Sequence, residues 1–375
     1  MKLFLILLLA ASLRLWNLPN RMVFLADQGR DMLRVYELYT TRRLTLLGPP
    51  SSQGNFFFGP GYYYLIAPGL ILANFSPIGV SLTVILIDLV GLYFLYRLTQ
   101  SAAVGLIYAT TPLLIHWSQS ALNPFFIPGL TVMCLFCLSR RRFFLAGILA
   151  GAIAQLHYAA VILAIFIFKP TFLLGWLMGV APMLAFELRH DWFNTKGMLA
   201  FLTTPQFRFF NLHYLAVLVP IMFWGAAKIF SRFRIFGVGL TALIVVMNLR
   251  QLDLNPAQGY TMPQNWNLPR AVDAAQLIAQ DVAQTKPQKS FNVAATLDGD
   301  SRALPLRYLL ISQFRTIPLG VEAYPQAQVL YLVTRLNREE VLSHGLWEIS
   351  SFSPERVTKI WPLVADINLY RLEKQ

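Results

Sequence analysis

Charged residues are scarce in this sequence. Asp, Glu, Lys and Arg make up 13% of the chain, whereas a soluble domain usually carries about 25%. Apolar residues account for 56%, and the mean hydropathy is +0.53. This balance excludes a protein that is water-soluble over its whole length, and most of the chain is expected to be solvated by lipid.

Acidic residues are rarest in the first two thirds of the chain. Residues 1–249 hold 6 of the 18 Asp and Glu but 18 of the 31 Lys and Arg, so nearly all of the net charge of +13 belongs to this part. The arginines lie in short connections between apolar runs, where basic residues meet the cytoplasm and lipid phosphates. We therefore expect membrane lipid as their partner and no nucleic acid.

Cysteine is limited to Cys134 and Cys137, a C-x-x-C pair inside an apolar run. In a soluble protein this spacing would indicate redox or metal chemistry. A thiol surrounded by lipid is normally a small hydrophobic group. The pair therefore predicts neither a disulfide framework nor a redox centre.

Long apolar runs are abundant, although several are short for a full crossing at 1.5 Å per residue. They cover residues 3–18, 78–96, 102–115, 125–138, 143–168, 172–186, 214–230 and 235–249. The first run resembles a cleavable signal peptide up to Ser12. It continues through Trp16 and further spans follow, so we expect an uncleaved first span.

Basic residues in the short connections predict the orientation. The clusters are Arg97, then Arg140 with Arg141 and Arg142, then Lys169, then Lys228 with Arg232 and Arg234. All four can face the cytoplasm only if residues 143–168 cross twice, as two half-helices that meet near Gln155, His157 and Tyr158. The resulting prediction is a multi-pass protein of the cell (plasma) membrane with nine spans, a cytoplasmic N-terminus and an extracytoplasmic part after residue 249.

The outward connection of residues 17–77 has its own pattern. Residues 27–38 alternate apolar and charged side chains as an interfacial amphipathic helix does. Residues 55–75 are aromatic and broken by Gly and Pro, which suits the headgroup region better than a crossing. Both segments are therefore placed at the outer membrane surface.

The pattern changes after residue 249 to that of a soluble α/β domain. Strand-like segments cover residues 290–296, 328–334 and 367–372, and helix-like segments cover residues 303–311 and 338–344. The predicted fold class is thus an α-helical polytopic membrane domain, residues 1–249, followed by an extracytoplasmic α/β domain, residues 250–375.

Five of the six carboxylates in residues 1–249 fall on the predicted outward face. The six are Asp27, Asp31, Glu37, Asp88, Glu187 and Asp191, and Asp88 alone lies deep in a span. Carboxylates supply a general base or metal ligands, and the forked guanidinium of arginine suits phosphate. The cluster therefore predicts a site at the outer surface, unless these are ordinary charges that face the headgroups.

Three segments resemble a known family. They are Phe24-Leu25-Ala26-Asp27-Gln28-Gly29-Arg30-Asp31 after the first span, Gly59-Pro60-Gly61-Tyr62-Tyr63-Tyr64-Leu65, and Phe186-Glu187-Leu188-Arg189-His190 after a late span. In sequence and placement they resemble the GT-C superfamily of membrane glycosyltransferases. The similarity is to the family-39-like enzymes, which include protein O-mannosyltransferases and lipid A aminoarabinose transferases, and it covers residues 1–249.

The resemblance implies an inverting glycosyltransferase that takes a sugar from a polyprenyl-phosphate donor to a glycan, lipid or protein acceptor. It places Asp27 at the position of the catalytic acidic residue. Gln28 stands where the family usually has a second acidic residue, and Asn123 where one is often found in the second outer loop. A divalent metal stays open as a cofactor, and these two replacements weaken the case for it because hard cations prefer charged oxygen ligands.

The other candidate residues each have two interpretations. Asp27 is a general base or a helix N-cap, and Asp31 and Arg34 bind the donor or pair with each other within the helix. Arg30 and Glu187 are assigned to donor binding. Arg189 and His190 contact the donor phosphate or are solvated loop charges. His157 is a donor-binding group or a packing histidine, Asn123 belongs to the acceptor or second-loop site, and Asp88 is expected to be a buried structural partner.

Two other functions stay open beside the transferase. A transporter or flippase of a lipid-linked glycan would place polar residues along a midplane pathway and show paired repeats, but here the ionisable residues gather at one face and no repeat is visible. A non-catalytic relative of the same superfamily would explain Gln28 and Asn123. The preferred interpretation is the glycosyltransferase.

Overall fold

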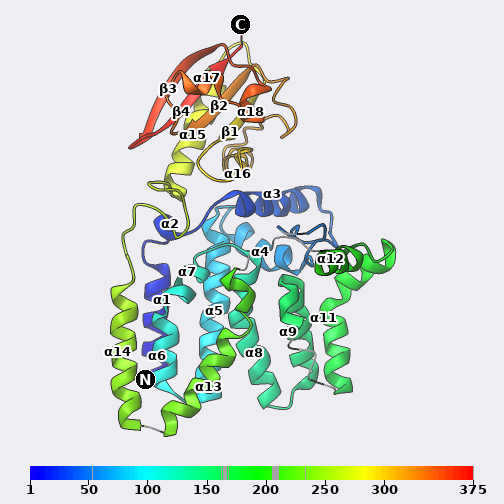
Figure 1. Ribbon diagram of the computed structural model, residues 1–375, viewed down its shortest axis with the longest axis vertical. Helices are drawn as coiled ribbons and strands as arrows, with labels where there is room; N and C mark the ends of the chain where they lie inside the picture. Colours follow the sequence, from blue (N-terminus) through cyan, green and yellow to red (C-terminus); the bar gives the residue numbers. More distant parts are fainter. Residues whose placement is uncertain are drawn as a thin grey trace. The chain divides into compact units, whose positions relative to one another are not determined.

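The protein forms two compact units in the computed structural model, which describes residues 1–52, 54–161, 163, 167, 169–204, 211–232 and 234–374 (Figure 1). The helical unit comprises Met1–Trp16, Thr41–Leu72 and Gly79–Leu254. The C-terminal unit comprises Asn17–Thr40, Ala73–Ile78 and Asn255–Gln375. Two short segments from the first 80 residues therefore belong to the same unit as the C-terminal third.

Helices make up the first unit. In chain order they are α1 (Lys2–Leu15), α4 (Gly61–Leu72), α5 (Ile78–Thr99), α6 (Ala102–Thr110), α7 (Pro112–Ser118), η1 (Asn123–Phe126), α8 (Ile127–Ser139), α9 (Phe143–Leu156), η2 (Tyr158–Val161), α11 (Pro170–Arg189), α12 (Phe193–Thr203), η3 (Leu212–Leu215), α13 (Val219–Arg232) and α14 (Arg234–Arg250). Among the described residues, α5 and α11 are long and apolar enough to cross a membrane by themselves, and five further apolar helices are shorter. The nine spans and their orientation stay predictions.

Two of the predicted spans are interrupted. Residues 102–115 divide into α6 and α7 at Thr111, because Pro112 cannot continue the preceding helix and begins the next one. In residues 143–168, α9 ends at Leu156 and His157 is extended, with φ −161°. The first predicted half-helix is therefore confirmed. The second falls largely on residues 162, 164–166 and 168, which lie outside the described residues.

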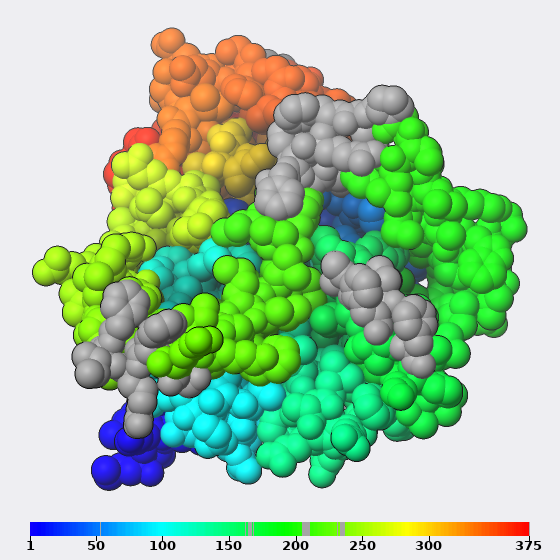
Figure 2. All heavy atoms as spheres, turned by 60° about the horizontal axis from the view of Figure 1, so that its bottom comes forward, coloured from blue at the N-terminus to red at the C-terminus, as the bar shows by residue number. Residues whose placement is uncertain are grey.

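Glycines allow α9 and α11 to pack closely. A Cβ on Gly147 would lie 2.1 Å from the carbonyl oxygen of Phe172, and one on Gly175 would lie 2.1 Å from that of Phe144. Gly151 and Gly179 face each other in the same way. Small residues let helix backbones approach each other where lipid offers no hydrophobic drive for association. On the other side of the unit, α13 packs against α6 and α8 and runs across the face turned to the viewer in Figure 2.

One buried ion pair joins α1 to α5. Arg14 Nε lies 2.7 Å from Asp88 Oδ2, and the Tyr108 hydroxyl donates to Asp88 Oδ1 at 2.7 Å. Arg14 also donates to the carbonyl oxygen of Ala109 at 2.9 Å. The prediction that Asp88 is a structural partner inside the bundle is confirmed.

The C-terminal unit holds a four-stranded sheet. Its elements are α2 (Leu18–Arg21), α3 (Ala26–Thr41), α15 (Leu268–Gln284), β1 (Phe291–Ala295), α16 (Leu304–Ser312), β2 (Val329–Thr334), α17 (Glu340–Ser343), α18 (Trp347–Ser350), β3 (Arg356–Val364) and β4 (Ile367–Glu373). The strand order is β1-β2-β4-β3, with β1 and β2 parallel and the other pairs antiparallel.

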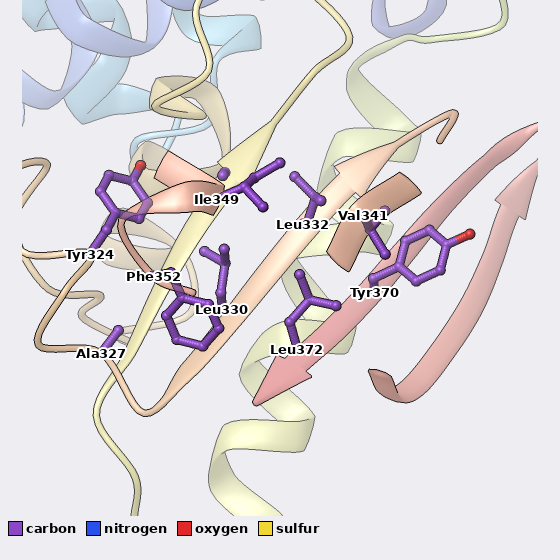
Figure 3. Packing of buried hydrophobic residues seen from close by; sticks show 10 residues of the cluster. Tyr324, Ala327, Leu330, Leu332, Val341, Ile349, Phe352, Tyr370 and Leu372 are labelled. Atoms are coloured by element: carbon purple, nitrogen blue, oxygen red, sulfur yellow. The ribbon is translucent and has the colours of Figure 1, made fainter. Parts of the chain in front are cut away.

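The core of this unit follows from strand alternation. Leu330 and Leu332 of β2 lie on one face with Tyr370 and Leu372 of β4, because side chains two residues apart share a face. Phe352 packs against them (Figure 3). The five elements predicted after residue 249 are confirmed as β1, α16, β2, α17 and β4, whereas α15 and β3 were not predicted.

Candidate functional site

The predicted catalytic carboxylate lies in the first turn of α3. The Asp27 side chain is 56% exposed, and its Oδ1 lies 2.7 Å from Arg30 Nη1. Arg30 also places its Nε 2.9 Å from Oδ1 of Asp31, which is buried. One guanidinium thus bridges two carboxylates, so Asp27, Arg30 and Asp31 form a single charged group.

Asp27 is not the N-cap of α3. The helix begins at Ala26, so Leu25 occupies the N-cap position and Asp27 is the second helical residue. The Leu25 amide instead donates to Gln28 Oε1 at 2.9 Å, which is the reciprocal half of a capping box. The N-cap interpretation of Asp27 is therefore wrong, and Gln28 has a structural use at the position where the resembled family carries an acidic residue.

Arg34 extends the polar side of α3. Its Nη1 lies 2.6 Å from Glu37 Oε2, and both side chains are more than 40% exposed. Solvent screening makes such a pair weak, so Arg34 can exchange Glu37 for another anion at little cost. Its assignment to donor binding stays a prediction.

Glu187 holds the start of α12. Its Oε1 accepts from the Asn194 amide at 3.2 Å and its Oε2 accepts from the Thr195 amide at 3.0 Å. Asn194 in turn accepts from the Phe57 amide at 2.8 Å. The Glu187 carboxylate is thus engaged by a helix N-terminus, where negative charge is stabilised.

His190 and Arg189 lie at the exposed end of α11. The His190 ring stacks on Phe186 at 4.1 Å, and its Nδ1 lies 2.9 Å from the Phe186 carbonyl oxygen. His190 lines a hollow of about 510 Å³ with Asn55, Lys196 and Phe201 among the other lining residues. Of the predicted residues, His190 is the one that the structure places in a cavity among the described parts of the chain.

His157 lies in an aromatic cluster at the end of α9. Its ring stacks on Phe58 at 5.5 Å and lies 4.9 Å from Tyr214 and 5.9 Å from His213. Burial lowers the pKa of His213. The cluster gives His157 the surroundings of a packing histidine, and its donor-binding role stays a prediction.

Gln155 explains why the segment before α4 carries two glycines. Its Oε1 accepts from the Gly61 amide at 3.0 Å, and its carbonyl oxygen accepts from the Gly59 amide at 2.9 Å. A Cβ on Gly59 would lie 2.6 Å from Gln155 Cβ. The Gly-Pro-Gly sequence is therefore the complement of a glutamine almost 100 residues away.

Asn123 bonds to the same region. Its Nδ2 donates to the carbonyl oxygen of Leu156 at 2.5 Å, which satisfies the C-terminal end of α9. A carboxylate could not donate this bond. In this chain Asn123 thus has a structural partner, while its part in an acceptor site stays a prediction.

Metal ligands do not gather in the part of the chain that the structure describes. No three His, Cys, Asp or Glu side chains there are close enough to hold one ion. The nearest approach to a ligand pair is Asp27 with Asp31, and Arg30 lies between them.

Sequence reasoning missed several residues that support these side chains. Gln28, Asn194 and Gln155 are uncharged polar residues within 5% of full burial, and composition gives them no signal. Their bonds run to backbone amides far along the chain or around a helix start. A capping-box search at Gln28 could have found one of them.

No protein-family profile and no curated protein matches the sequence. Two solved structures match over 98% of this chain and 97% of theirs, both of ArnT from Cupriavidus metallidurans. One, bound to undecaprenyl phosphate, has a TM-score of 0.55 at 12% identity, and the apo form has a TM-score of 0.53 at 13% identity. ArnT is a lipid A aminoarabinose transferase of the GT-C type. The chain therefore shares the fold of a GT-C glycosyltransferase along nearly its whole length, as its first outer loop predicts.

Proposed function

We propose that this protein is an inverting glycosyltransferase that moves a sugar from a polyprenyl-phosphate donor to an acceptor at the outer face of the membrane. The observation that supports it best is the exposed Asp27 carboxylate in the first turn of α3, held by Arg30. The same chain shares its fold with a transferase whose solved structure holds undecaprenyl phosphate.

The chemistry assigns Asp27 the role of general base. An acceptor hydroxyl is a poor nucleophile at neutral pH, so a carboxylate within hydrogen-bond reach must take its proton as the new bond forms. The acceptor oxygen attacks the anomeric carbon from the side opposite the phosphate. The bond from that carbon to the phosphate oxygen breaks, the proton passes to Asp27 and the polyprenyl phosphate leaves with the electron pair.

Charge on the leaving phosphate needs a cationic partner. Arg30 and Arg34 lie on the same helix as Asp27, and guanidinium groups bind phosphate with two parallel bonds. Arg189 and His190 are the further candidates, at the end of α11. We assign the stabilisation of the leaving group to arginine, and because Arg30 already bridges Asp27 and Asp31, we expect activity to persist in a metal chelator.

A donor panel tests the proposal. Purified protein in nanodiscs is incubated with polyprenyl-phosphate sugars and with extracted membrane acceptors, and released polyprenyl phosphate is measured with and without EDTA. We expect release with at least one donor, its loss in Asp27→Asn, and its retention in Glu37→Gln, a matched change on the same helix. Movement of intact donor across a vesicle membrane without release would instead indicate a flippase.

A further inference from the structure

The start of α3 has no cap of its own. The first amides of a helix need acceptors from outside the helix, and Leu25, at the N-cap position, has none in its side chain. Gln28 accepts from the Leu25 amide. The next amide, that of Ala26, hydrogen-bonds to the carboxyl group of Asp298, which lies some 270 residues later in the chain.

A second contact joins the same turn to the same part of the chain. A Cβ on Gly29 would lie 2.5 Å from the carbonyl carbon of Leu304 and 2.5 Å from the nitrogen of Pro305. Both atoms are backbone at the start of α16, so they cannot move aside as a side chain could. Only glycine permits this approach.

The segment that leads into α3 is buried by the same domain. Phe24 is fully buried, its ring lies edge-on to Tyr308 at 6.2 Å, and its amide donates to Met262 Sδ at 3.3 Å. Phe24, Asp298 and Pro305 also line one small cavity of about 20 Å³. The loop after β1 and the start of α16 therefore surround the residues immediately before Asp27.

The far half of α3 is held as well. The Arg315 guanidinium lies over the Tyr36 ring, 5.6 Å from its centroid, and donates to the Tyr36 hydroxyl. The Tyr36 ring also packs edge-on against Phe75, whose carbonyl oxygen accepts from Tyr308 at 2.5 Å. Both ends of the helix are thus fastened to one body.

We propose that the α/β domain positions the catalytic helix, and that Asp298 is the positioning residue because it caps α3 one residue before Asp27. Its catalytic consequence rests on the function proposed above, whereas the capping itself does not. Asp298 acts through the helix backbone and Gly29 sets the distance. The domain therefore has a role in catalysis without contacting the sugar.

The placement of Asp298 is costly for a surface-loop carboxylate. Burial raises its pKa, against the opposing effect of the backbone hydrogen bonds that it accepts. Strongly perturbed carboxylates are more frequent at functional sites than elsewhere. A residue that served only the loop could remain in solvent, as Asp273 on α15 does.

Hydrogen exchange of the intact protein tests the positioning directly. In Asp298→Ala we expect peptides covering residues 24–34 to exchange roughly tenfold faster, the usual effect of losing a cap, with the sheet unchanged. Asp298→Asn should restore slow exchange because an amide oxygen caps equally well. Asp273→Ala is the control for loss of a carboxylate from the same domain.

Activity supplies the second readout. Asp298→Ala should lower turnover about tenfold with KM nearly unchanged, Asp298→Asn should recover it, and Asp298→Ala should add no loss in an Asp27→Asn background. Gly29→Ala should reproduce the faster exchange, while Gly299→Ala, where a Cβ meets nothing within 4 Å, should not.

Unchanged exchange in both Asp298→Ala and Gly29→Ala would overturn the positioning role, as would failure of Asp298→Asn to restore slow exchange. If no donor is consumed by the unmodified protein, the proposed transferase function fails, and the exchange experiment still decides whether Asp298 caps the helix.

Discussion

The two units use their carboxylates differently. In the helical unit Asp88 and Glu187 are each 6% exposed, and each has both oxygens engaged by partners on the protein. In the C-terminal unit Asp27 is more than half exposed and one of its oxygens pairs with Arg30. A carboxylate whose oxygens are all occupied holds structure together, whereas one that solvent and ligands can reach is available for proton transfer.

The difference has a physical origin. A charge inside a bundle is tolerated only with full pairing, because desolvation costs several kcal/mol per ion. At the start of an interfacial helix, solvent supplies the missing partners and a substrate can displace them. Both kinds of carboxylate are equally visible in the sequence, and only their partners distinguish a structural one from a reactive one.

The largest expected effect is on the buried pair. Asp88→Ala leaves Arg14 buried without its partner, so we expect unfolding in detergent to require about 3–5 kcal/mol less. Arg97→Ala, at the exposed end of the same helix, should change stability by less than about 0.5 kcal/mol. A loss below about 1 kcal/mol for Asp88→Ala would mean that water reaches the pair.

Asp27→Asn should show the opposite behaviour. We expect turnover to fall roughly a hundredfold or more, the usual size of a general-base contribution, with stability nearly unchanged because the side chain is exposed. Steady-state kinetics and thermal unfolding on the same preparation measure both. The role assignment would be wrong if Asp27→Asn stayed active while Asp31→Asn was inactive.

Glu187 lies between these two cases. Glu187→Ala removes the acceptor for two amides at the start of α12, and an unsatisfied buried group costs about 1–3 kcal/mol. Thermal unfolding should show a loss of this size. Asp191→Ala, an exposed neighbour, is the matched control. A normal stability combined with a large loss of turnover would move Glu187 from the structural to the reactive class.

The smallest expected effect is on donor affinity. Arg189→Ala removes one charged partner for the donor phosphate, so we expect binding about tenfold weaker, within the range of a charge-assisted hydrogen bond. Arg43→Ala, exposed in the same unit, should leave binding unchanged. Titration with a non-hydrolysable donor measures the affinity. Equal effects of the two variants would indicate general attraction between the basic protein and the phosphate.

The sequence alone determined the elements that periodicity and apolar length encode. The amphipathic pattern of residues 27–38 predicted α3, and alternation in residues 290–296 and 328–334 predicted β1 and β2, because local side-chain spacing decides which face is buried. Scarcity of carboxylates also identified Asp27 and Asp88 as special. Helix α15 was missed because its many alanines give little contrast between faces, and β3 because its exposed edge strand carries mostly polar residues.

Tertiary structure decided which partner each of these residues has. Nothing in residues 24–31 shows that α3 is capped by Asp298, that Gly29 touches the backbone of Leu304, or that the helix belongs to the C-terminal unit. These contacts join positions some 270 residues apart. Local pattern carries no record of them, because the free energy that selects them arises only when both segments are folded and their backbone groups must be satisfied together.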